Sequence, residues 1–68
     1  MIKSIGDMMK EFIEIDAKVI CETEAAILID DGDTREWIPK SQLEDWPEVE
    51  KTGTVLIAEW IAAEKGFI

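Results

Sequence analysis

The chain has 68 residues, which is enough for a single domain, 1–68. Hydrophobic residues make up 47% of it, a share that excludes an intrinsically disordered chain and predicts a domain that folds alone. Sixteen acidic residues against seven basic ones give a net charge of −9, which disfavours direct binding to nucleic acid or to an anionic membrane surface.

The cysteine count and the first residues bear on the compartment. Cys21 is the only cysteine, so an internal disulfide is excluded and a reducing cytoplasm is favoured. The stretch from Met1 to Phe12 lacks the charged start and apolar centre of a signal peptide, and no apolar run is long enough to span a membrane. We therefore expect a cytoplasmic protein, and the sequence leaves its oligomeric state open.

The first two expected elements are a helix and a strand. Residues 4–10 have a helical pattern that Gly6 weakens. From Phe12 to Cys21 apolar side chains then alternate with mostly charged ones, which predicts a half-buried antiparallel strand over 12–22. This alternation places Cys21 on the apolar side, so we expect a buried thiol there.

A hairpin follows this strand. The apolar run 25–29 predicts a second, more fully buried strand over 24–30. Asp31-Gly32 is a strong signal for a chain reversal, because glycine adopts positive φ without steric cost. The chain then returns as a third strand over 34–39, which Pro39 ends because proline has no N–H for the ladder.

The rest of the chain predicts a turn, a loop, a strand and a helix. Residues 39–43 look like a short helical turn, and the polar stretch 44–52 like a loop that Trp46 tucks down. A fourth strand is expected over 53–58 and a short helix over 59–65. Gly66 then takes the left-handed position after the helix, and Phe67 makes the usual apolar contact beyond it.

These elements define the expected fold class. It is α+β but mainly β: a small antiparallel sheet or open barrel of about four strands with a short C-terminal helix. An SH3-like or OB-like half barrel is the nearest familiar shape.

The residues needed for catalysis are scarce. The chain has no histidine and no tyrosine, and a carboxylate or lysine would need a deep pocket to shift its pKa, which so short a chain scarcely builds. Cys21 has no base to activate it. The aspartates near Gly32 lack the ligand spacing of a calcium loop, and a single thiol does not make a zinc site. We expect no catalytic residue, no cofactor and no metal.

The acidic residues gather in two clusters, which are the candidate partner-binding residues. The first acidic cluster contains Glu22, Glu24, Asp30, Asp31, Asp33 and Glu36. The second acidic cluster contains Glu44, Asp45, Glu48 and Glu50, and it surrounds Trp46. These carboxylates either only keep the domain soluble or form an array, laid out like phosphates, that the Lys and Arg of a partner grip.

The three tryptophans also have two interpretations. In a thin core we expect at least two of Trp37, Trp46 and Trp60 to be packing residues. A tryptophan left at the surface would serve as a binding hot spot. Trp46, which lies among acids in a polar segment, is the best candidate for that role.

Two strings in the second half of the chain resemble segments of known proteins. They are Trp37-Ile38-Pro39-Lys40-Ser41-Gln42-Leu43 and, later, Glu59-Trp60-Ile61-Ala62 with Glu64-Lys65-Gly66. They are similar to the W-I-P-K-S-Q and E-W-x-A-x-x-K-G segments of a group of small phage and prophage proteins. The resemblance implies a phage setting and a similar small sheet, and it carries over no site residue.

A phage setting favours use of the acidic surface, since acidic anti-CRISPR inhibitors and DNA mimics are proteins of the same general class. We therefore expect a non-enzymatic inhibitor in the cytoplasm of a phage-infected cell. Its partner would be a basic nucleic-acid-binding protein, such as a CRISPR effector subunit, whose nucleic-acid site it occludes. The alternative is a structural, replication or recombination accessory protein of a phage, in which the acids only confer solubility.

Overall fold

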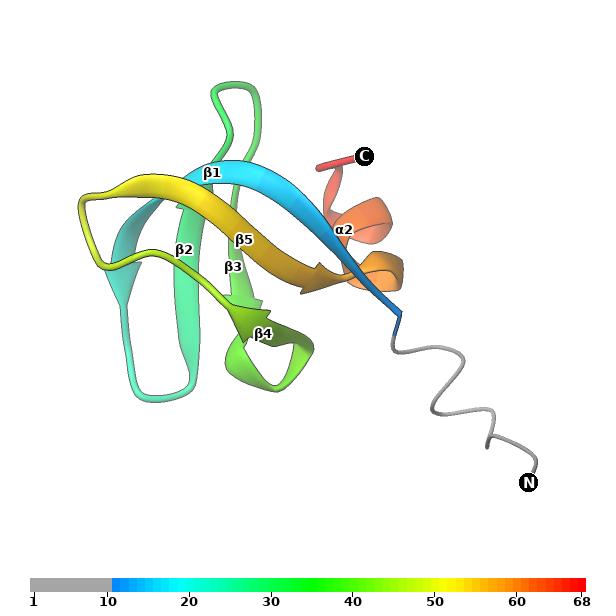
Figure 1. Ribbon diagram of the computed structural model, residues 1–68, viewed down its shortest axis with the longest axis horizontal. Helices are drawn as coiled ribbons and strands as arrows, with labels where there is room; N and C mark the ends of the chain where they lie inside the picture. The colour runs from blue at the N-terminus through cyan, green and yellow to red at the C-terminus, as the bar shows by residue number, and fades with distance from the viewer. Residues whose placement is uncertain (1–10) are drawn as a thin grey trace.

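The computed structural model describes residues 11–68, so the helix expected over 4–10 lies outside the described residues. Figure 1 shows a mainly β fold with one short helix after the last strand, which confirms the expected class. The elements in chain order are β1 (Phe12–Glu22), β2 (Ala26–Asp30), β3 (Arg35–Pro39), the 3-10 helix η1 (Lys40–Gln42), β4 (Leu43–Asp45), β5 (Thr52–Ala58) and α2 (Glu59–Lys65).

The strands form one open antiparallel sheet in the order β3-β2-β1-β5-β4. The long strand β1 pairs with β5 along its first part and with β2 along its last part. Lys18 takes part in both pairings, because it lies opposite Thr52 of β5 and opposite Asp30 of β2. The sheet therefore curls around β1, and the edge strands β3 and β4 are joined through η1 (Figure 1).

The core fills the inside of this curled sheet. Among the described residues no polar or charged side chain is buried. The buried side chains are all apolar: Ala17, Val19, Ile27, Ile29, Ile38, Leu43, Val55, Ile57, Ala58, Ile61, Ala62 and Phe67. Every strand contributes one side chain or more, so this small core depends on all five strands and on the helix.

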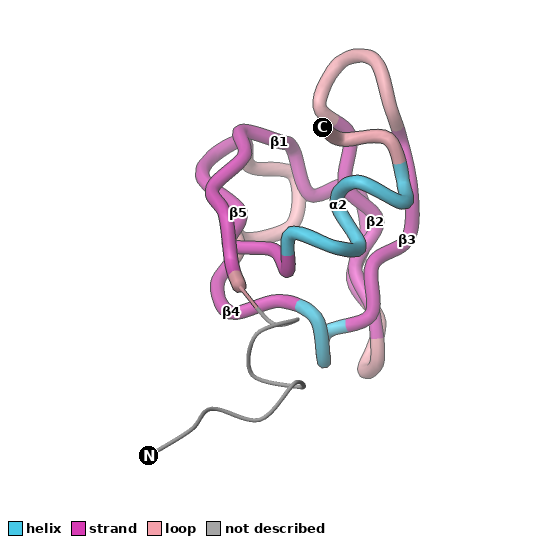
Figure 2. Tube along the Cα trace, turned by 90° about the vertical axis from the view of Figure 1, so that its right-hand side faces the viewer, coloured by secondary structure: helices cyan, strands magenta, loops and turns pink. Residues whose placement is uncertain are grey.

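Helix α2 lies across the opening between β5 and β3 (Figure 2). Gly66 ends the helix with φ 89°, and the Phe67 N–H donates to the Ala62 carbonyl over 2.8 Å, as expected for a left-handed helix end. The Thr34 hydroxyl donates to the Gly66 carbonyl over 3.2 Å, which ties this end to the β2–β3 loop. Within residues 11–68 no helix has the length and apolar character needed to cross a membrane.

Strand β4 is a difference from the sequence prediction, which assigned residues 44–52 to a loop. Leu43 is buried opposite Ile57, and Asp45 lies opposite Leu56. A strand of three residues with a single buried side chain has too little alternation to be recognised from sequence.

Cys21 is exposed, so the prediction of a buried thiol is wrong. The pairing of β1 with β2 shifts between Val19 and Cys21: Val19 lies opposite Ile29, but Cys21 lies opposite Leu28. Ile20 is the extra residue of this β-bulge. One inserted residue moves every later side chain to the other face of a strand, and this turns Cys21 outward.

Candidate acidic binding surface

Three of the six carboxylates of the first acidic cluster form ion pairs within the domain. Glu22 pairs with Lys40 at 2.7 Å, and Asp30 pairs with Arg35 at 2.9 Å. Glu36 lies 3.9 Å from Lys65 of α2. These contacts join β1 to η1, the two strands of the β2–β3 hairpin, and β3 to the helix, so these three carboxylates have a local structural role.

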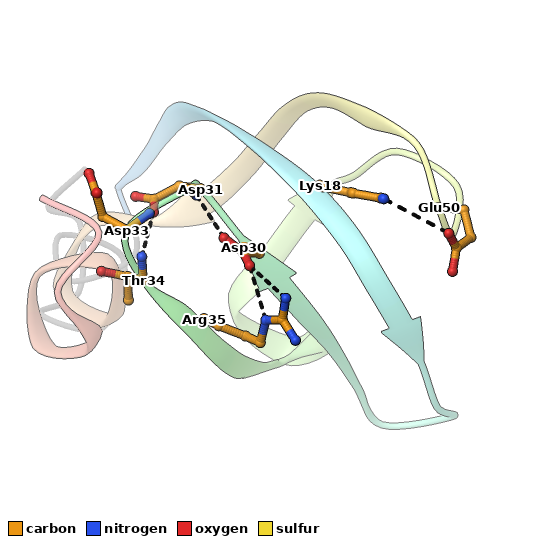
Figure 3. A network of polar contacts seen from close by, with 8 residues as sticks. Lys18, Asp30, Asp31, Asp33, Thr34, Arg35 and Glu50 are labelled. Carbon is orange, nitrogen blue, oxygen red and sulfur yellow. Dashed lines mark hydrogen bonds and ion pairs between the residues drawn. The ribbon is translucent and has the colours of Figure 1, made fainter.

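Asp30 and Asp31 also build the β2–β3 turn (Figure 3). The Asp31 carboxylate accepts the backbone N–H groups of Asp33 and Thr34 over 2.9 and 2.8 Å. The Asp30 carboxylate accepts the Gly32 N–H over 2.7 Å, and Gly32 has φ 104°. This hydrogen bond from Gly32, together with the one from Arg35, holds the pKa of Asp30 below its ordinary value. The expected chain reversal is confirmed, and the carboxylates of Asp30 and Asp31 are engaged in it.

Glu24 and Asp33 are the members of the first acidic cluster whose carboxylates form no hydrogen bond or ion pair in the described part of the chain. Glu24 lies in the β1–β2 loop and Asp33 in the β2–β3 loop, at opposite ends of β2. A strand of five residues is roughly 16 Å long. The first acidic cluster is therefore not one continuous array on the surface.

The second acidic cluster stays closer together, on β4 and the turn after it. Glu44, Asp45 and Glu48 are exposed, and in residues 11–68 no basic side chain lies within 4 Å of them. Glu50 adopts φ 73°, and its N–H donates to the Val19 carbonyl over 2.7 Å, which fixes the turn to β1. Its carboxylate lies 3.9 Å from Lys18, and both side chains are largely exposed (Figure 3).

The tryptophans differ from the prediction. Trp46 is half-buried against the core, with the Lys40 ammonium 5.6 Å from the centre of its ring. It tucks its segment down as expected, but it is not the tryptophan left at the surface. Trp37 and Trp60 are exposed by 44% and 40%, so two of the three are surface residues rather than core packing residues.

Strand pairing adds two carboxylates that the sequence analysis did not select. Glu14 of β1 lies opposite Leu56 of β5, which lies opposite Asp45 of β4. Directly opposite residues share a face of the sheet, and so does Asp16, two positions after Glu14. The alternation of β1 did put Glu14 and Asp16 on its polar side, but which strand lies beside β1 is not visible in the sequence.

We call Glu14, Asp16 and Asp45 the acidic sheet face. The backbone positions of Glu14 and Asp16 are roughly 7 Å apart along β1, and those of Glu14 and Asp45 are roughly 10 Å apart across β5. Two like charges at ~7 Å in water repel by roughly 0.6 kcal/mol, and salt screens this further. The repulsion is small enough for the fold to tolerate, and it is relieved when a cation binds between the charges.

The basic side chains form no ion pair with this face within residues 11–68, although Lys18 lies on it, two positions after Asp16. Residues 11–68 contain five of them: Lys18, Arg35, Lys40, Lys51 and Lys65. All but Lys51 lie within 4 Å of an acid, and in each case that acid lies outside the acidic sheet face. In the described part of the chain, Glu14, Asp16 and Asp45 therefore have no ion-pair partner.

A hollow of about 440 Å³ lies beside the acidic sheet face, where β1 bends. Its charged lining residues are Asp16, Lys18, Asp30, Asp31 and Arg35. No group of three metal-ligating side chains occurs among residues 11–68. The arrangement offers charged groups that bind other charged groups. Comparisons with known protein families, characterised proteins and solved structures found no significant match to this chain.

Proposed function

We propose that this protein is a non-enzymatic binding protein whose acidic sheet face occupies the nucleic-acid-binding surface of a basic protein. The observation that carries the proposal is that Glu14, Asp16 and Asp45 have no ion-pair partner within residues 11–68, where four of the five basic side chains pair with other acids. Because strands of one sheet hold the three carboxylates, binding costs little conformational ordering of the backbone. Glu44 of β4 and Glu48 of the turn after it add further negative charge at this edge of the sheet.

The mechanism is occlusion. Lysine and arginine side chains that normally hold phosphates would form charge-assisted hydrogen bonds with the carboxylates instead. A net charge of −9 also accelerates encounter with a basic partner. Nucleic acid would then be excluded from the covered surface by both steric overlap and charge.

An anti-defence inhibitor of a phage is the biological form of this proposal that we favour. Its support is the resemblance of residues 37–43 and 59–66 to segments of small phage proteins, together with the acidic composition. The partner in that form is a basic nucleic-acid-handling protein of the host, such as a CRISPR effector subunit.

A second candidate function has an observation of its own. Exposed acids also lie outside the acidic sheet face: Glu24 and Asp33 at the two ends of β2, and Glu64 on α2. Such a distribution suits a protein whose charge only keeps it soluble, as in a phage accessory protein.

Two variants with equal net charge distinguish these functions. The face variant carries Glu14→Gln, Asp16→Asn and Asp45→Asn, and the matched control carries Glu24→Gln, Asp33→Asn and Glu64→Gln. Each removes three negative charges from exposed positions. Immobilised wild-type protein and both variants are used to capture partners from host extract, and mass spectrometry identifies them.

The proposal predicts that wild-type and control proteins capture the same basic protein and that the face variant loses it. Added nucleic acid should compete for that protein. Equal capture by all three proteins, or equal loss from both variants, contradicts a role for the acidic sheet face.

A further inference from the structure

The β-bulge at Ile20 creates an apolar row on the outer face of the sheet. Cys21 of β1 lies opposite Leu28 of β2, and Leu28 lies opposite Trp37 of β3. Opposite residues share a face, so the three side chains form one line across three strands. Cys21 is exposed, Leu28 is half-buried and Trp37 is 44% exposed.

Other apolar residues widen this row. Pro39 follows Trp37 by two positions on β3 and lies opposite Ala26, so both extend the same face beyond Trp37 and Leu28. On the other side Ile20 lines the hollow at the bend of β1. An outward apolar patch that contains an exposed tryptophan is typical of an interface core, since tryptophan concentrates binding energy.

The hollow supplies a charged rim for this apolar row. Next to the apolar row, Lys18, Asp30 and Arg35 lie opposite one another across the same three strands. The charge of Arg35 is neutralised by its ion pair with Asp30. Asp16 and Asp31 also line the hollow, so it contains three carboxylates and two cations. An apolar centre with a polar, slightly negative rim is the usual anatomy of a protein interface.

We propose that the row Cys21–Leu28–Trp37 is a docking surface for a segment of a basic protein, in which an apolar side chain lies next to a lysine or arginine. The apolar side chain packs on Trp37 and Leu28, and the basic side chain enters the hollow near Asp16 and Asp31. Charge decides between this occupant and a second copy of the chain, because two molecules of −9 repel each other. The inference rests on the proposed function, whose acidic sheet face shares Asp16 with this hollow.

The test uses Cys21 as its own reporter. Two peptides of equal charge serve as probes: both have two basic residues at each end, and the centre is Leu-Phe-Leu in one and Ser-Gly-Ser in the other. Alkylation of Cys21 by iodoacetamide is followed with and without each peptide, and affinity is measured by tryptophan fluorescence. The apolar peptide should bind at least roughly tenfold more tightly than the polar one and should slow the alkylation of Cys21.

Trp37→Ala should remove that tenfold preference, whereas Trp60→Ala, at an equally exposed tryptophan on α2, should leave it unchanged. Leu28→Ser is a second variant on the row and should weaken the preference as well. If both peptides bind equally and Cys21 stays reactive, the docking surface is wrong. If alkylation of the free protein is slow and dilution accelerates it, a second copy covers the row, and the proposed occupant is wrong.

The acidic sheet face is tested separately. Neutralising Glu14, Asp16 and Asp45 should weaken the binding of both peptides to a similar extent, since both peptides carry the same charge. If Trp37→Ala removes the preference for the apolar peptide but neutralising the three carboxylates does not weaken binding, the docking surface stands and the proposed function is contradicted. If neutralising the three carboxylates weakens the binding of both peptides but Trp37→Ala leaves the preference for the apolar peptide unchanged, only the docking surface is contradicted.

Discussion

Cys21 lies directly opposite Leu28, whereas unbroken pairing of β1 with β2 would place it opposite Ile27. This shift of one position decides which side chains face outward in the last part of β1. Ile27 stays wholly buried, and Cys21 joins Leu28 and Trp37 on the outside. The outward side of β1 is therefore acidic before the bulge, at Glu14 and Asp16, and apolar after it, at Cys21.

The first prediction concerns the reactivity of this thiol. Because Cys21 is exposed, iodoacetamide should modify it in native buffer at a rate within a few-fold of the rate in denaturant. Mass spectrometry of samples quenched over time gives both rates. Native protection of a hundredfold or more that does not change on dilution would mean that the bulge is absent and that Cys21 faces the core.

The second prediction separates the roles of two tryptophans. Trp46→Ala removes a half-buried ring that packs against the core, so the free energy of unfolding should fall by roughly 2 kcal/mol. Trp37→Ala removes an exposed ring and should change it by no more than about 0.5 kcal/mol. Urea unfolding followed by circular dichroism measures both. A larger loss for Trp37→Ala than for Trp46→Ala would reverse the assignment.

The sequence predicts the fold better than the surface, and particular residues show why. Alternation and the Asp31-Gly32 turn locate four strands to within two residues, because they depend on local physics. The helix over 59–65 agrees with the structure at both ends. A one-residue bulge at Ile20 leaves no local signal, and this is why the prediction for Cys21 fails.

The third prediction tests the end of α2. Gly66 has φ 89°, and a Cβ added there would meet nothing closer than the Thr34 hydroxyl at 3.9 Å. Gly66→Ala should therefore destabilise only through the backbone, by about 1 to 2 kcal/mol. Gly66→Asn should cost less, because asparagine tolerates the left-handed region better. Equal stability of the wild type, Gly66→Ala and Gly66→Asn would show that residue 66 does not adopt the left-handed backbone conformation.

The fourth prediction follows from the lowered pKa of Asp30. A carboxylate with a lowered pKa stabilises the fold at pH values above its unfolded pKa of about 3.9, and this stability is lost as the pH falls through the lower folded value. Asp30→Asn should therefore lower the melting temperature by the same amount from about pH 7 to about pH 5. The difference from wild type should shrink below about pH 3.9.

Asp33→Asn is the control for this experiment, because it removes the same charge from the same turn at an exposed position. Melting curves of the three proteins are compared across this pH range. A difference between wild type and Asp30→Asn that persists unchanged at low pH would show that the ionised carboxylate is not the stabilising group.

The acidic surface could be predicted only in part. The sequence shows the number of carboxylates but not which of them are already paired, because each ion pair joins separate elements. Glu36 and Lys65, for example, are 3.9 Å apart although β3 and α2 are distant in sequence. For the same reason the sequence does not show that Glu14 and Asp45 share a face of the sheet, which depends on β5 lying between β1 and β4.

The most direct test of the acidic sheet face is the salt dependence of its affinity for the captured basic partner. We compare the dissociation constants of wild type, the face variant and the charge-matched control between about 50 and about 300 mM NaCl, over which screening becomes strong. Wild type and control should both weaken by roughly tenfold or more, whereas the face variant should bind weakly and with little salt dependence. If the face variant and the control bind equally at every salt concentration, the position of these carboxylates does not matter, and the claim is wrong.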